Sequence, residues 1–366
     1  MLRRSEAGDA LPVAMIIRSI GVMLAGAGIF LLLMSNTYTP VIKDENGRII
    51  EMAIAEERRM NLGGEEQYVL IRGYDRSSPL LIFLHGGPGY SVMPFNRLRN
   101  ADLEQDFIFV NWDQRGAGYS YRAARDPKTL TLDRIISDLD ELIDALCAEF
   151  DQEKVILVGH SWGSLVGLTY IDWRPEKVAG YIGVSQFSNN PASEREGYEW
   201  ALAEARARND VKSIDTLAEV GFPPYDSVDE MWKQRRILNK MGGVWFEPKP
   251  DYYYVIEYLR AAEFAWPGLW SLRRGGQLSI EKLFSTAFTA NAAVAYPELE
   301  TPIFFIEGRH DHVVSTRQAE LYFNTLSAPY KELIWFEHSA HAPNWEEPEK
   351  FNNEVRRIGK ELGLLD

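Results

Sequence analysis

A serine flanked by glycines stands between an apolar run and a helical pattern. The pentapeptide Gly159-His160-Ser161-Trp162-Gly163 directly follows the apolar residues 155–158 and precedes a helical pattern over 164–170. Glycines two residues before and after the serine remove side chains that would collide in a tight turn between strand and helix. The turn would lift the hydroxyl of Ser161 toward a substrate carbonyl, which it could attack if a base and an orienting acid lie nearby.

Candidates for the base and the acid follow in chain order. The apolar run 333–336 leads to His338 and His341, and we favour His341 because it lies deeper in the loop that must reach the serine. The run 303–306 leads to Glu307 and Asp311, and we favour Asp311 because Glu307 still belongs to the strand end. The order serine, aspartate, histidine is typical of one fold of serine hydrolases.

A glycine-rich loop follows an earlier apolar run. Residues 80–84 lead directly into His85-Gly86-Gly87-Pro88-Gly89, where the absence of side chains lets backbone N–H groups approach a developing oxyanion. His85 and His160 are better explained as residues that hold turns by hydrogen bonds than as catalysts. The 6 histidines form no H-x-x-x-H pattern and the chain has one cysteine, so the sequence predicts neither a metal site nor a cofactor.

Five motifs together resemble a known family. They are His85–Gly89 (HGGPG), 113–120 (DQRGAGYS), 159–164 (GHSWGS), 308–311 (GRHD) and 339–341 (SAH). The set looks like the α/β-hydrolase superfamily and, within it, the proline iminopeptidase-like serine peptidases. The resemblance covers about residues 47–185 and 301–366. It implies Ser161 as nucleophile, His341 as base, Asp311 as its orienting acid, and the backbone N–H groups of Gly87 and Trp162 as the oxyanion hole.

The resemblance has a departure at the elbow and a gap in the middle of the chain. Proline iminopeptidases usually carry glycine before the serine, whereas His160 stands here, as in many esterases of the superfamily. In that family, acidic residues of an inserted cap bind the substrate's free α-amine. One predicted helix, 192–208, supplies four candidates for this role: Glu194, Glu196, Glu199 and Glu204. The alternative is a solvated helix face with arginines interspersed among the glutamates.

The pattern of apolar runs predicts a mostly parallel sheet covered by helices on both faces, in agreement with the α/β-hydrolase fold that the resemblance implies. Antiparallel strands over 48–55 and 68–72 would open a mostly parallel sheet, with helices such as 132–150 on both faces. The predicted organisation is an anchor or signal segment (1–35), a tether (36–46), two core parts (47–186 and 292–366) and, between them, a helical cap rich in aromatic residues (187–291).

An apolar segment at the N-terminus predicts membrane attachment. Residues 11–34 are apolar apart from Arg18 and Ser19, and 24 residues at about 1.5 Å each would span roughly 36 Å, enough for a bilayer core of about 30 Å. Arg3, Arg4 and Arg18 favour a cytoplasmic N-terminus, which places the catalytic part outside the cell or in the periplasm. A shorter count of the run would fit a signal peptide.

Composition and motifs together suggest one leading function. The formal charge of -14 argues against nucleic acid as a partner. We expect a membrane-anchored serine hydrolase that cleaves an amide or ester of a small molecule or short peptide through an acyl-enzyme, with proline iminopeptidase-like activity first. The alternatives are a carboxylesterase or small-molecule amidase of the same fold and, in another class, a non-catalytic binding protein that has kept the hydrolase shell.

Overall fold

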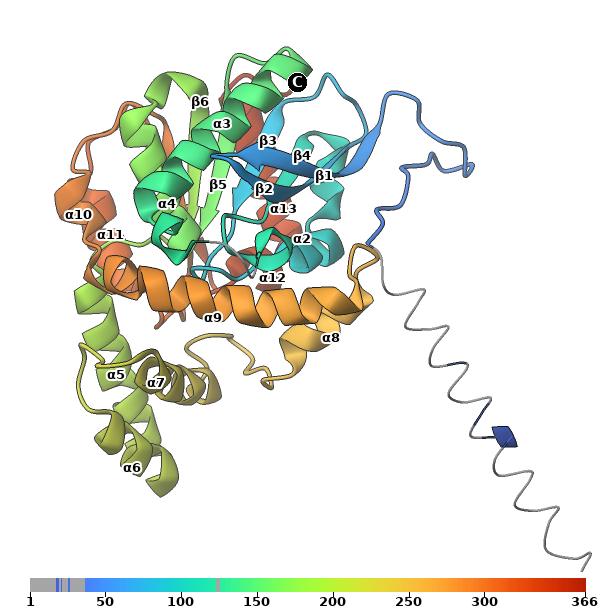
Figure 1. The fold of residues 1–366 in the computed structure, drawn as a ribbon. Helices are drawn as coiled ribbons and strands as arrows, with labels where there is room; N and C mark the ends of the chain where they lie inside the picture. Colours follow the sequence, from blue (N-terminus) through green and yellow to red (C-terminus); the bar gives the residue numbers. More distant parts are fainter. Residues whose placement is uncertain (1–17, 20, 22–25, 27–36, 123–125) are drawn as a thin grey trace, which may run out of the picture.

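A largely parallel sheet forms the centre of the molecule (Figure 1). The computed structural model describes residues 18, 19, 21, 26, 37–122 and 126–366. Its described residues form an eight-stranded sheet of order β1-β2-β4-β3-β5-β6-β7-β8, in which β1, β2 and β4 pair antiparallel and all later pairs are parallel. The strands are β1 (Ile54–Leu62), β2 (Glu65–Gly73), β3 (Leu80–Leu84), β4 (Ile108–Trp112), β5 (Val155–His160), β6 (Val178–Val184), β7 (Ile303–Gly308) and β8 (Lys331–Phe336).

The described helices fall into two groups. Those of the core are α2 (Met93–Arg99), α3 (Leu132–Phe150), α4 (Trp162–Trp173), α10 (Ala292–Ala295), α11 (Thr316–Thr325), α12 (Pro343–Glu346) and α13 (Pro348–Glu361). Between β6 and α10 lie α5 (Asn190–Ala207), α6 (Val211–Val220), α7 (Val228–Met241), α8 (Tyr253–Arg260) and α9 (Trp266–Thr289). This second group lies below the sheet in Figure 1, with α9 running along its lower edge. Short 3₁₀ turns connect several core elements.

Helices cover both faces of the sheet, as the apolar runs predict. On one face of the sheet, α3 and α4 form a buried cluster with every second strand residue, such as Leu157. On the other face, α2 and α13 form a second cluster with the remaining strand residues, such as Val158. Because strands in such a sheet are buried on both faces, they read in the sequence as continuous apolar runs. The predicted helix 132–150 is confirmed as α3, whose N-terminus is capped by the Thr131 side chain.

The prediction for the first strand is wrong. The sequence pattern suggested a strand over 48–55, but β1 spans Ile54–Leu62 and pairs with β2 in a nine-residue register. Asp44 instead ties residues 44–48 into a turn by accepting hydrogen bonds from the N–H groups of Asn46 and Arg48. Residues 56–59 are Glu-Glu-Arg-Arg, so the real edge strand lacks the apolar alternation that would have marked it.

The predicted N-terminal anchor, 1–35, lies almost entirely outside the described residues. Within the part of the chain that the structure describes, every helix is too short or too polar to cross a bilayer.

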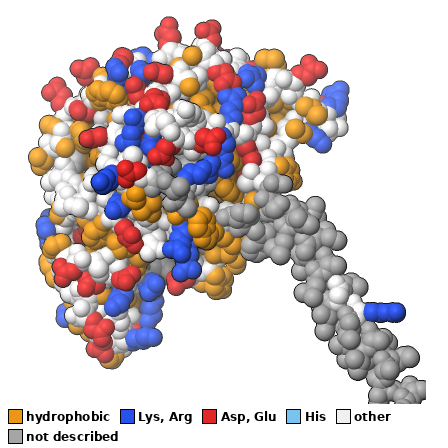
Figure 2. Space-filling model, in the orientation of Figure 1, with side chains coloured by type: hydrophobic (Ala, Val, Ile, Leu, Met, Phe, Trp, Pro, Cys, Tyr) orange, Lys and Arg blue, Asp and Glu red, His pale blue; other side chains and the backbone are white. Residues whose placement is uncertain are grey.

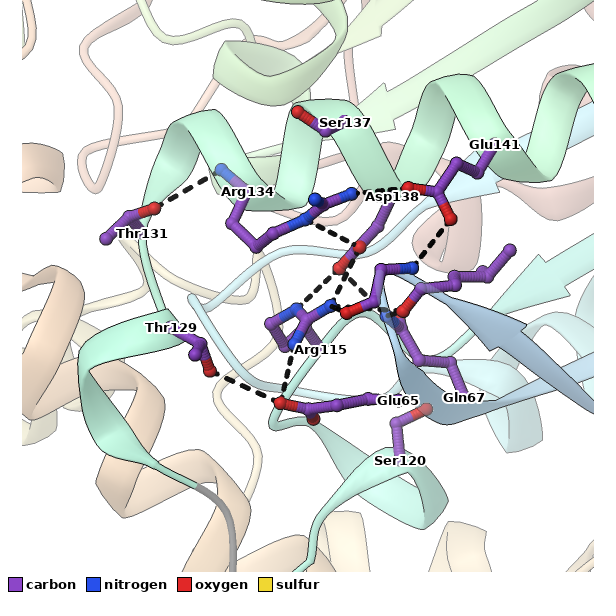
Figure 3. A network of polar contacts seen from close by, with 12 residues as sticks. Glu65, Gln67, Arg115, Ser120, Thr129, Thr131, Arg134, Ser137, Asp138 and Glu141 are labelled. Atoms are coloured by element: carbon purple, nitrogen blue, oxygen red, sulfur yellow. Dashed lines mark hydrogen bonds and ion pairs between the residues drawn. The ribbon is translucent and has the colours of Figure 1, made fainter.

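A buried ion-pair network fixes the loop that follows β4 (Figure 3). Arg115 donates to both carboxylate oxygens of Asp138, at 2.6 and 2.8 Å, and pairs with Glu65 at 2.6 Å. Asp138 also accepts from Gln67 at 2.8 Å and from Arg134 at 2.9 Å. Asp138 is fully buried and Arg115 nearly so, so each charge depends on the other for compensation. The network connects β2, α3 and the 113–120 loop.

We expect Asp138→Ala to lower the free energy of unfolding by about 3–5 kcal/mol, because it leaves the buried Arg115 charge without its main partner. Glu141→Ala is the control: Glu141 is half exposed, and its two partners, the partly exposed Arg134 and the Gly63 N–H, lie at the surface, so its loss should cost about 0–1 kcal/mol. Urea unfolding of the two variants would measure the difference. Equal stabilities would contradict this role for Asp138.

Candidate active site

The serine sits in a strained turn between β5 and α4. Ser161 has φ 55° and ψ −121°, a backbone conformation that L-residues rarely adopt and that costs of order 1–3 kcal/mol. Neighbouring backbones leave no room for side chains at the flanking glycines: a Cβ would lie 2.5 Å from the Gly163 oxygen at Gly159 and 2.0 Å from the Leu84 oxygen at Gly163. The turn therefore requires glycine at both positions.

Ser161, His341 and Asp311 form one hydrogen-bonded chain. The Ser161 Oγ lies 2.9 Å from His341 Nε2, and His341 Nδ1 lies 2.8 Å from Asp311 Oδ2. They come from the ends of β5, β8 and β7, which meet at one edge of the sheet because the strands are parallel. With Nδ1–H donated to Asp311, Nε2 is left to accept the serine proton.

The carboxylate of Asp311 is held in its charged form. Its side chain is fully buried, which alone would raise its pKa, but the neighbouring His341 and hydrogen bonds from the N–H groups of Val314 and Val313 lower the pKa below 3.8 overall. Those backbone groups lie 3.0 and 2.8 Å from Asp311 Oδ1. Asp311 can therefore stabilise an imidazolium at His341 throughout the neutral range.

The competing candidates have other surroundings. Glu307 is fully buried and accepts the N–H of Gln186 at 2.9 Å, and burial raises its pKa well above 4.5. His338 lies beside Phe246, and its N–H donates to Glu347 at 3.0 Å. Neither side chain is placed between Ser161 and Asp311.

Two buried histidines hold the loops around the serine. His160 Nε2 donates to the backbone carbonyl of His341 at 2.7 Å, and burial lowers the pKa of His160 to about 3. His85 Nε2 accepts the backbone N–H of Gln114 at 3.1 Å, and burial lowers its pKa to about 4. Both rings are neutral at pH 7, which suits positioning rather than proton transfer.

The glycine-rich loop approaches the serine closely. A Cβ on Gly86 would lie 3.1 Å from the Ser161 Cβ, and the next residue, Gly87, has φ 120°. Trp162 starts α4, where the first backbone N–H groups have no acceptor within the helix. Gly86 and Ser161 therefore lie close together, and Gly87 and Trp162 are the residues that follow them in the chain. Their backbone N–H groups are the predicted oxyanion donors.

Gln114 is a site residue that the sequence did not single out. Its Nε2 donates to the carbonyl of His85 at 2.9 Å, and its Oε1 accepts the indole N–H of Trp162 at 3.2 Å. It therefore bridges the glycine-rich loop and the elbow, whose separation sets the width of an oxyanion hole. The only signal in the sequence was its place in the 113–120 motif.

The segment that follows α7 holds both loops that carry His341 and Asp311. The carbonyl of Val244 accepts the N–H of His341 at 3.0 Å, and the carbonyl of Gly243 accepts the N–H of His312 at 3.0 Å. The His312 ring also stacks on Trp200 of α5, with centroids 3.8 Å apart. Ser161 itself is only 6% exposed.

The four glutamates predicted on one helix do lie on α5, but only one is buried. Glu194 is 4% exposed and pairs with Arg235 of α7. Within the described part of the chain, its second oxygen, Oε2, has no hydrogen-bond partner. The other three have surface environments: Glu196 accepts from Gln318 at 2.7 Å, Glu204 pairs with Arg208 at 2.8 Å, and Glu199 is exposed.

Burial alone would lower the pKa of Arg235, but the neighbouring Glu194, with smaller contributions from Tyr225 and Asp311, raises it overall, so Arg235 stays charged beside Glu194. Among the described residues, no group of three His, Cys, Asp or Glu side chains is arranged to hold a metal ion.

Comparison with known proteins identifies the family. Residues 79–348 match the alpha/beta hydrolase fold family. The chain belongs to the α/β-hydrolase family. A probable aminopeptidase, YbaC, of Bacillus subtilis is 30% identical over 308 residues, which cover 83% of this chain and 96% of the relative. A proline iminopeptidase of Heyndrickxia coagulans is 26% identical, over 74% of this chain and 87% of its own. This hydrolase therefore has aminopeptidase and proline iminopeptidase relatives.

Solved structures show the same fold at lower identity. A proline iminopeptidase-related protein from Thermus thermophilus superposes with a TM-score of 0.60 at 21% identity, over 84% of this chain and 98% of its own. A bacterial membrane phospholipase A superposes with a TM-score of 0.60 at 15% identity, over 96% of both chains. At these identities the likeness concerns the fold alone.

The buried neutral His160 predicts a pH dependence of stability. From pH 6.5 down toward 3 the unfolded chain binds a proton at this residue that the folded hydrolase does not, so stability falls as the pH falls. Each such histidine adds about 1.4 kcal/mol per pH unit to the slope of the free energy of unfolding against pH. We expect His160→Gln to remove one such contribution, seen as a shallower fall in urea-unfolding free energy between about pH 6 and about pH 5. Unchanged slopes would contradict a neutral, buried His160.

Proposed function

We propose that this protein is a serine hydrolase in which Ser161 attacks the carbonyl carbon of an amide or ester. The observation that supports this most is the hydrogen-bonded chain from Ser161 through His341 to Asp311, with the serine in a nucleophile-elbow conformation. A non-catalytic protein that had kept only the hydrolase fold would not need the strained backbone at Ser161. The non-catalytic alternative is therefore disfavoured.

The reaction proceeds by acyl transfer. His341 Nε2 takes the serine proton as the Oγ–C bond forms, and the backbone N–H groups of Gly87 and Trp162 bind the oxyanion. The imidazolium then gives its proton to the leaving amine or alcohol, which departs as the acyl-enzyme forms. Water, deprotonated by the same imidazole, releases the acid and restores Ser161. Asp311 stays ionised throughout and stabilises the imidazolium.

The substrate we favour is a short peptide or aminoacyl amide with a free N-terminus. The names of the curated relatives support an aminopeptidase of the proline iminopeptidase kind. Of the four predicted glutamates, Glu194 is the best placed to bind an α-ammonium group, because its side chain is buried and one carboxylate oxygen remains unpartnered within the described structure. A lidded carboxylesterase is the alternative, and substrate tests separate the two.

We further propose that the enzyme is attached to a membrane by residues 11–34, with its N-terminus in the cytoplasm and its catalytic part outside or in the periplasm. The support is the length of the apolar run and the arginines that precede it.

Ser161→Ala should lower the turnover of the preferred substrate by about 10⁶-fold, because the other groups of the site cannot replace the nucleophile. Full-length enzyme in detergent would be assayed against the p-nitroanilide of proline with a free amine, the same compound with a blocked amine, and p-nitrophenyl acyl esters. Release from the free-amine anilide alone supports the aminopeptidase. Turnover of esters alone makes it an esterase, and hydrolysis that persists in Ser161→Ala would refute the assignment of Ser161.

Glu194→Gln should raise KM for a free-amine anilide at least about tenfold and leave KM for an acyl ester unchanged, because a buried charge pair to an ammonium group contributes well over 1 kcal/mol. Glu199→Gln, an exposed neighbour on α5, is the matched control. A rise in KM for both substrate types would indicate a structural role of the Glu194–Arg235 pair instead.

A further inference from the structure

Helix α8 exposes a stripe of large apolar side chains. Tyr252 directly before the helix is 63% exposed, and Val255, Ile256 and Leu259 within it are 41%, 43% and 37% exposed. Their spacing of three, one and three residues places them on one face. We call these four residues the α8 stripe.

The opposite face of α8 is anchored on the core. The Tyr258 hydroxyl donates to the carbonyl of Ser91, and the buried Glu257 pairs with Arg99 of α2 at 2.7 Å. The rings of Tyr254 and Phe95 also pack together. The helix therefore cannot rotate to bury the α8 stripe without breaking a buried ion pair. Contiguous apolar side chains that stay exposed in this way mark an interaction surface.

The chain that follows the apolar N-terminal run is docked beside this helix. Thr39 Oγ1 donates to Glu263 Oε1 at 2.9 Å, three residues after α8 ends. Arg97 pairs with the same Glu263 oxygen at 2.7 Å, and Arg72 of β2 donates to the carbonyl of Pro40 at 2.6 Å. Glu263 is 1% exposed, so this network holds residues 39–40 firmly against the segment that joins α8 to α9.

The short tether limits how far α8 can be from the end of the apolar run. Thr39 comes five residues after Met34, and an extended chain covers at most about 3.3–3.6 Å per residue, so the tether can span at most about 18 Å. In Figure 1 the blue start of the continuous ribbon lies beside the connection from α8 to α9, and Figure 2 shows hydrophobic side chains gathered on the body near that place.

We propose that the α8 stripe lies in the surface of the lipid bilayer. The proposal rests on the membrane attachment proposed above: if residues 11–34 cross the bilayer, the short tether brings α8 to its surface, where the apolar face of an interfacial helix is buried. The residues at the ends of the stripe suit the headgroup region: Tyr252 has an aromatic ring with a polar tip, and Arg260 ends the helix with an exposed guanidinium. Tyr38, which precedes the docked Thr39 in the chain, is also exposed (64%).

The test is fluorescence quenching on the full chain reconstituted into vesicles of phosphatidylcholine and phosphatidylglycerol. In a Cys147→Ser background, Ile256→Cys is labelled with a small fluorophore, and quenching is measured with lipids that carry a nitroxide near the top of the acyl chain. The control is Leu321→Cys, an equally exposed leucine (49%) on α11, which packs beside β7 far from β2 in the sheet. Flotation on a density gradient reports vesicle attachment separately.

We expect at least about twofold stronger quenching at position 256 than at position 321, since an interfacial helix buries its apolar face about 5–10 Å deep. Equal, weak quenching in a chain that floats with the vesicles would overturn the proposal and leave the membrane attachment intact. Energy transfer between copies labelled at position 256, without lipid quenching, would mean that a second copy covers the stripe. A chain that does not float would refute the attachment and this proposal together.

Discussion

The imidazole of His341 imposes the strictest geometric requirement on this structure. One ring nitrogen lies 2.9 Å from Ser161 and the other 2.8 Å from Asp311, so three loops from three different strands must meet within hydrogen-bonding distance. A parallel sheet meets the requirement because the carboxyl ends of β5, β7 and β8 lie at the same edge. The strain at Ser161 is tolerated because the surrounding backbone determines the turn.

The same loops are also held by residues with no chemical role of their own. The backbone of His341 is held at both of its polar groups: its carbonyl accepts from the ring of His160, and its N–H donates to the carbonyl of Val244. Gln114 joins the glycine-rich loop to Trp162. Because residues 243–244 hydrogen-bond to the loops that carry His341 and Asp311, a displacement of this segment would also displace the residue that moves the proton.

Much of this arrangement could be predicted from the sequence, for physical reasons. Ser161, Asp311 and His341 each follow a short apolar run, and buried parallel strands necessarily read as such runs. The three residues that the motifs single out meet in the structure, and their catalytic roles stay predictions. Helix α3 was predictable from the 3.6-residue period of its apolar side chains. By contrast, β1 was misplaced because an edge strand of Glu and Arg residues carries no alternation.

Other features leave no mark in a single sequence. The contacts of Gly243 and Val244 with the catalytic loops use backbone carbonyls, which every residue possesses. Four glutamates on one helix look alike in the sequence, and only the partner Arg235 on another helix distinguishes Glu194. The α8 stripe was similarly hidden among the cap aromatics, because its exposure depends on which face of the helix the core covers.

Mass spectrometry of the protein after reaction with a fluorophosphonate would show whether Ser161 is the nucleophile that forms the acyl-enzyme. We expect wild type to form one covalent adduct rapidly, on the peptide that contains Ser161. Asp311→Asn should lose this rapid labelling, because it leaves His341 in the wrong tautomer, which slows such reactions by about 10⁴-fold. An unmodified Ser161 peptide in folded wild-type protein, or an adduct on another residue, would contradict this role of Ser161.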